Sequence, residues 1–164
     1  MNITLHQTHH IIADFEGIFD YIKTNFNRET QGIHVFPELF LTGYPLQDLC
    51  LQKPFVAKYT HFLSELKNWL KKNINQDSCF LILGGIDYQL TDKGIPTVIK
   101  NVIFQFGDGL NLEPIYTKRL LPNYDIFDEK KYFTKGNEVK VLKLKDKLIG
   151  LLICAVSYTH LTLP

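Results

Sequence analysis

The chain has 164 residues, 45% of them hydrophobic, which is enough to bury one core. Its 18 basic and 17 acidic residues give a formal charge of +1, without the electrostatic footprint of a nucleic-acid-binding protein. Cys50, Cys79 and Cys154 form no Cys-x-x-Cys pair, so the sequence predicts neither a disulfide framework nor a metal centre and favours a reducing, cytoplasmic setting. The longest apolar run, residues 148–156, is too short to span a bilayer, so no membrane partner is expected.

The first half of the chain alternates predicted strands and helices. Residues 2–7 alternate apolar and polar side chains, as a strand does. Asp14 is the predicted cap of a helix with a regular apolar stripe: Phe15, Ile18, Phe19, Ile22 and Phe26. A buried strand is predicted at residues 33–36. A second helix is predicted from Pro54 to about Lys72, because proline favours the first helical turn.

The second half is predicted to consist mainly of strands. An apolar run closed by Gly84-Gly85 predicts a buried strand, and the region around Pro122 reads as an irregular loop. The predicted strands cover residues 79–86, 97–106, 112–116, 139–144 and 148–154, and the loop covers residues 121–133. This order favours an α+β layered domain over a doubly wound sheet. None of the common nucleotide-binding or zinc-binding motifs is present, so no cofactor or metal ion is expected in this segment.

Glu38, Lys118 and Cys154 each close a predicted strand, which would bring them to neighbouring loops. Such a set is sufficient for acyl transfer: the thiol attacks an amide carbonyl, the carboxylate accepts the thiol proton, and the ammonium stabilises the oxyanion. Taken singly, each residue has an ordinary alternative. Glu38 and Lys118 could be solvated surface charges, and Cys154 could be a small buried hydrophobe.

Three segments together resemble the catalytic blocks of the nitrilase (carbon–nitrogen hydrolase) superfamily. They are Phe-Pro-Glu-Leu-Phe-Leu-Thr-Gly-Tyr-Pro at 36–45, the segment 116–133, and Gly-Leu-Leu-Ile-Cys at 150–154. More narrowly, residues 41–49 and 121–129 resemble the amino-terminal glutaminase domain of glutamine-dependent NAD synthetases. The resemblance implies a nitrilase-like αββα sandwich of which this chain holds only the first part.

The resemblance also implies a role for each matching residue. Glu38 would be the general base, Lys118 the oxyanion-stabilising lysine and Cys154 the nucleophile. Tyr124 would contact the substrate glutamine, and Glu129 would be a second acid that orients the lysine or the substrate, or a purely structural residue. The substrate would be a small amide, L-glutamine, hydrolysed through a cysteine thioester. The ammonia would pass to a separate carboxyl-terminal synthetase domain, where ATP and deamido-NAD would bind. Relatives of this kind are homo-oligomers.

The family pattern breaks after Cys154, where Cys-Glu-Asp is usual and Ala155-Val156 stands instead. We expect residues 1–156 to be the amino-terminal part of the hydrolase domain and residues 157–164 to be a non-native tail of a truncated reading frame. The chain as written is then expected to be inactive or barely folded. Re-sequencing across the Cys154 codon tests this expectation. Two alternatives stay open: a stand-alone superfamily amidase acting on another small amide, and an inactive fragment or scaffold.

Overall fold

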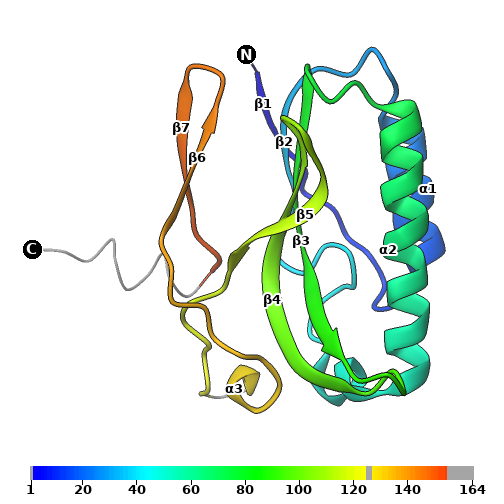
Figure 1. Ribbon diagram of the computed structural model, residues 1–164, viewed down its shortest axis with the longest axis vertical. Coiled ribbons are helices and arrows are strands. Elements are labelled where there is room, and N and C mark those ends of the chain that lie inside the picture. Colours follow the sequence, from blue (N-terminus) through cyan, green and yellow to red (C-terminus); the bar gives the residue numbers. More distant parts are fainter. Residues whose placement is uncertain (1, 125–126, 155–164) are drawn as a thin grey trace, which may run out of the picture.

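A five-stranded sheet forms the centre of the computed structural model, which describes residues 2–124 and 127–154 (Figure 1). The strand order is β1-β2-β3-β4-β5. The first three strands run parallel to one another, and the last three run antiparallel. The strands are β1 (Ile3–Leu5), β2 (Gly32–Val35), β3 (Cys79–Leu90), β4 (Pro96–Gly107) and β5 (Leu110–Thr117). The sheet is therefore mixed, as in an α+β domain.

Two helices, α1 (Phe15–Asn25) and α2 (Lys53–Asn73), cover one face of this sheet (Figure 1). Asp14 caps α1 as predicted, because its side chain accepts a hydrogen bond from the Gly17 backbone N–H at 3.0 Å. The predicted apolar stripes of both helices face the sheet and form one large cluster with it. Its fully buried members include Ile18, Ile22, Tyr59, Leu66, Leu70 and Leu81. A short 3-10 helix, η1 (Gln47–Leu51), precedes α2.

The hairpin of β6 (Lys140–Leu144) and β7 (Lys147–Leu151) covers part of the opposite face (Figure 1). Apolar side chains of the hairpin and of the sheet form a second, separate cluster: Ile33, Phe80, Ile82, Ile103, Tyr116, Leu142, Leu144, Leu151 and Ile153. The sequence predicted a single core. The described residues instead contain two, because the sheet buries apolar side chains on both of its faces.

The structure corrects several predicted element boundaries. β3 does not end at residue 86, just after Gly84-Gly85, but continues to Leu90, because its pairing with β4 extends past both glycines. The predicted loop at 121–133 contains a short helix, α3 (Glu129–Tyr132). β7 ends at Leu151, so Cys154 lies three residues beyond the strand. The α+β nitrilase-like fold class is correct for the described residues. The predicted tail, residues 157–164, lies outside the described residues.

Candidate active site

Glu38 lies in a tight turn that follows β2. The Phe36 N–H donates to the Ile82 carbonyl at 2.9 Å, and the Leu41 N–H donates to the Gly84 carbonyl at 3.0 Å, so both sides of the turn are fastened to β3. Gly84 allows this close approach, since a Cβ at that position would lie 2.4 Å from the Pro37 carbonyl oxygen and 2.8 Å from the Cα of Glu38. The turn therefore holds Glu38 at the edge of the sheet face that the hairpin covers.

Lys118 follows directly after β5 and is fully buried, as its side chain is only 1% exposed. Its backbone N–H donates to the Asn101 carbonyl at 2.8 Å, and its carbonyl accepts from the Gly136 N–H at 2.8 Å. Its Nζ lies 2.6 Å from Glu38 Oε1 and 2.8 Å from Glu129 Oε2. The structure thus brings together three residues that are up to 91 positions apart in the chain (129 − 38).

The electrostatics of this cluster follow from one ammonium lying between two carboxylates. Burial alone would lower the pKa of Lys118, but Glu38 and Glu129 outweigh it and raise that pKa above its ordinary value. Lys118 is therefore a cation at neutral pH and cannot act as a base. Burial, assisted by the charge of Glu38, raises the pKa of Glu129, although the Lys118 ammonium opposes this shift.

Glu129, the first residue of α3, is 4% exposed and has a second partner in the Tyr44 hydroxyl, which donates to its Oε1 at 3.3 Å. Burial and the neighbouring carboxylates raise the pKa of Tyr44, so this hydroxyl stays protonated and keeps its role as a donor. Because Glu129 contacts both Lys118 and Tyr44, it can hold the Lys118 ammonium in position.

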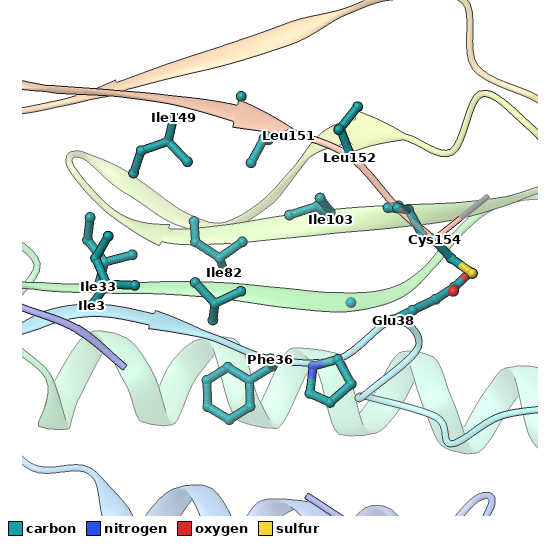
Figure 2. A pocket seen from close by; sticks show the side chains of 15 residues that line it. Ile3, Ile33, Phe36, Glu38, Ile82, Ile103, Ile149, Leu151, Leu152 and Cys154 are labelled. Carbon is teal, nitrogen blue, oxygen red and sulfur yellow. The ribbon is translucent and has the colours of Figure 1, made fainter. Parts of the chain in front are cut away.

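Cys154 and Glu38 lie at one end of a cavity of about 260 Å³ between the sheet and the hairpin (Figure 2). Their side chains point toward one another, while the rest of the cavity is lined mainly by apolar side chains such as Ile82, Ile103 and Ile149 (Figure 2). Cys154 is exposed and has a φ of 41°, a left-handed conformation that is uncommon for a residue with a Cβ. An exposed thiol facing a carboxylate is an arrangement suited to nucleophilic attack.

The other two cysteines differ from Cys154 in their surroundings. Burial raises the pKa of Cys50 to about 11 and the pKa of Cys79 to about 12. Both thiols therefore stay protonated and unreactive near neutral pH. Among residues 2–124 and 127–154, no cluster of histidine, cysteine, aspartate and glutamate side chains has the arrangement of a metal centre, and no helix is long and apolar enough to cross a membrane.

Tyr124, the predicted substrate contact, lies apart from the buried cluster. It is 60% exposed, and its ring packs edge-on against Phe127 with the ring centroids 5.6 Å apart. The structure therefore places Tyr124 at the surface, whereas Glu38, Lys118, Glu129 and Cys154 converge.

Two residues near the site were not predicted from the sequence. Tyr44 lies in the segment 36–45 that resembles a catalytic block, but no role was predicted for it. Asn101, in the middle of β4, donates from Nδ2 to Glu38 Oε1 at 2.7 Å. The signal that could have identified Asn101 is a single amide within a strand of mainly apolar residues, from Val98 to Phe104.

The mixed sheet thus carries an acid, an ammonium and a thiol grouped at one place, a set of groups suited to acyl transfer. The sequence matches the carbon-nitrogen hydrolase family over residues 5–162. The chain belongs to that family.

Relatives by sequence include the glutamine-dependent NAD(+) synthetases of Thermotoga maritima, 32% identical over 157 residues, and of Aquifex aeolicus, 29% identical over 156 residues. Each match covers 94% of this chain and 25% of the relative, so the chain spans about a quarter of the length of these proteins. Among solved structures, the glutamine-dependent NAD+ synthetase of Acinetobacter baumannii superposes with a TM-score of 0.73 at 24% identity, covering 98% of this chain and 28% of that one. A nitrilase-superfamily amidase from Nesterenkonia superposes with a TM-score of 0.68 at 20% identity, covering 92% and 54%. These superpositions define the fold.

Proposed function

We propose that this site hydrolyses the side-chain amide of glutamine by acyl transfer to the Cys154 thiol. The observation that carries the proposal is the buried Lys118 ammonium, 2.6 Å from Glu38, next to a cavity that Glu38 shares with Cys154. The sequence relatives named above are glutamine-dependent enzymes, and this supports glutamine as the amide.

In the first half-reaction, Glu38 accepts the thiol proton while the Cys154 sulfur forms a bond to the amide carbon. The carbonyl electrons move to the oxygen, and the Lys118 ammonium stabilises the resulting oxyanion. An ammonium has three N–H donors. In this site the carboxylates of Glu38 and Glu129 occupy two directions around Nζ, which leaves one donor for the oxyanion. Glu129 keeps the lysine charged and oriented.

The first half-reaction ends with the release of ammonia, and the second restores the thiol. When the oxyanion collapses, the carbon–nitrogen bond breaks and Glu38 returns its proton to the leaving nitrogen, which departs as ammonia. A water molecule, deprotonated by Glu38, then attacks the γ-glutamyl thioester. The carbon–sulfur bond breaks, the Cys154 sulfur takes the proton back from Glu38, and glutamate leaves. In this proposal Tyr124 would have to reach the substrate from the surface loop that precedes α3.

The names of the sequence relatives, glutamine-dependent NAD(+) synthetases, point to a use for the ammonia. We propose that it serves the ATP-dependent amidation of deamido-NAD in a synthetase domain, with ATP and deamido-NAD bound outside the segment described above. A second candidate, an amidase acting on another small amide, is suggested by the fold shared with the Nesterenkonia amidase. The two candidates differ in which amide should protect the Cys154 thiol from a labelling reagent: glutamine for the glutaminase, another small amide for the amidase.

The test is covalent labelling of the chain with a glutamine analogue that carries a diazoketone in place of the amide. Peptide mass spectrometry should find one adduct, at Cys154, because Cys50 and Cys79 are buried and protonated. Excess L-glutamine should slow the labelling, whereas acetamide should not, and Cys154→Ala should abolish it. Labelling that glutamine does not slow would contradict the glutaminase proposal, and protection by acetamide would favour the amidase. Ammonia release above the Cys154→Ala background would show that the chain as written is active, contrary to expectation.

A further inference from the structure

Asn101 contacts both the acid and the lysine of the site. It is 0% exposed, lies in β4 opposite Ile86 of β3, and donates from Nδ2 to Glu38 Oε1 at 2.7 Å. Its backbone carbonyl accepts the N–H of Lys118 at 2.8 Å. A residue in a central strand is held rigidly by its neighbours, so a hydrogen bond from it can fix the position of the Glu38 side chain.

The orientation of the Asn101 amide is set by Glu38. The opposite orientation would place Oδ1 against Glu38 Oε1, and two acceptors cannot share a hydrogen bond. In the observed orientation, Oδ1 is buried without a hydrogen-bond partner among the described residues. A buried acceptor without a partner is unfavourable for stability. The Asn101 side chain therefore costs stability through Oδ1, and its hydrogen bond from Nδ2 to Glu38 offsets that cost.

We propose that Asn101 is a positioning residue that fixes the carboxylate of Glu38 for proton transfer with Cys154, an inference that rests on the proposed hydrolase function. Asn101 and Lys118 both bind Oε1 of Glu38, and neither of them occupies Oε2. Both contacts hold the carboxylate by the same oxygen, and the Glu38 side chain points toward Cys154 at the end of the cavity (Figure 2).

The experiment measures the pH profile of Cys154 alkylation by iodoacetamide in the 164-residue chain, together with the urea midpoint of unfolding. Glu38→Gln sets the reference, because removing a carboxylate next to a thiol moves the alkylation midpoint to lower pH, by roughly half a unit or more. Asn101→Leu, close in shape but without a donor, should move the profile in the same direction and leave the urea midpoint unchanged or higher. Asn101→Ala, which adds no atoms next to Glu38, should give the same displacement.

The matched control is Gln105→Leu. Gln105 is another buried amide of β4, 2% exposed, but its Nε2 donates to the Gly107 carbonyl at 3.2 Å instead of to the site. Gln105→Leu should lower the urea midpoint and leave the alkylation profile superimposed on that of the parent chain. The proposal is overturned if the Asn101 variants also superimpose, or if Gln105→Leu gives an equal displacement. Failure of the hydrolase function would appear separately, as the absence of glutamine-protected labelling.

Discussion

The two faces of the central sheet are built in different ways. On the face covered by α1 and α2, buried aliphatic and aromatic side chains interlock, as where the Phe15 and Phe62 rings stack with centroids 5.2 Å apart. On the face covered by the β6–β7 hairpin, the apolar cluster is smaller and borders a cavity of about 260 Å³ (Figures 1 and 2). Glu38 and Cys154 meet at the end of that cavity. The filled face supports the fold, and the proposed active site lies at the open face.

The largest expected effect concerns the charge buried next to the open face. Lys118→Met keeps the length of the side chain but leaves Glu38 and Glu129 without their cation. We expect the free energy of unfolding near neutral pH to fall by about 3 to 5 kcal/mol, as when one partner of a buried ion pair is removed. Urea unfolding measures the loss. It should shrink in acid, because Glu129, whose pKa is already raised by burial, then becomes neutral.

Lys67→Met is the control for this prediction. Lys67 Nζ lies 2.6 Å from Glu113 Oε1, the same distance as in the Lys118–Glu38 pair, but the two side chains are 39% and 46% exposed. Solvent screens such a pair, so its loss should cost less than about 1 kcal/mol. Equal losses for Lys67→Met and Lys118→Met would show that burial does not set the strength of the site.

A pair of leucine truncations compares the packing of the two faces directly. Leu66 of α2 is 0% exposed in the filled cluster, so Leu66→Ala should cost about 3 kcal/mol or more. Leu151 of β7 lines the cavity, so its side chain already borders unfilled space, and Leu151→Ala should fall at the lower end of the range, about 2 kcal/mol. Urea unfolding of both variants checks the order. A larger loss for Leu151→Ala would mean that the hairpin face is packed as tightly as the helix face.

Glycine substitutions test how closely the Glu38 turn is fitted to the sheet. In Gly84→Ala the new Cβ would lie 2.4 Å from the Pro37 carbonyl oxygen, so the turn must shift. We expect a loss of about 1 to 3 kcal/mol, as for overpacked sites, and a changed pH profile of Cys154 alkylation. Gly150→Ala in β7 is the matched control, since its Cβ would meet nothing within 4 Å. If Gly84→Ala left both the stability and the profile unchanged, the fit of the turn would not determine the position of Glu38.

The two faces also differ in how much of them could be predicted from the sequence. The helix-covered face was largely predictable, because the apolar stripe from Phe15 to Phe26 and the cap at Asp14 are local signals. The residues that converge in the site were found by their position after strands and by the resemblance to known catalytic blocks.

The features that could not be predicted depend on contacts between residues that are far apart in the sequence. β3 continues past Gly84 because β4 pairs with it, and a strand pattern alone reads that glycine pair as an end. The role of Asn101 depends on a turn 63 residues away in the chain. The burial of Glu129 likewise depends on Lys118 and Tyr44, which local pattern cannot reveal.

The smallest expected effect concerns a series of hydrogen bonds that links Tyr21, His6 and His34. His34 Nε2 must donate to the Gln31 carbonyl at 3.0 Å, because a carbonyl only accepts. In the neutral state His34 Nδ1 then accepts from His6 Nε2, 3.0 Å away, and His6 Nδ1 accepts from the Tyr21 hydroxyl, 2.9 Å away. This assignment satisfies each of these groups with both rings neutral. Burial, and then His34, lowers the pKa of His6 below its ordinary value of 6.5.

Because the folded state binds the His6 proton less readily than the unfolded state, protonation favours unfolding. The contribution of His6 is complete above its ordinary pKa and is lost as the pH falls below about 6.5 toward the lowered value. We expect His6→Phe, which keeps the ring stacked on Phe36, to reduce the drop in urea midpoint between about pH 7.5 and about pH 5.5. His10, whose pKa burial also lowers, should maintain part of the drop. An equal drop in the variant and the parent chain would mean that the acid sensitivity arises elsewhere, and the carboxylates of the open face would be the next groups to examine.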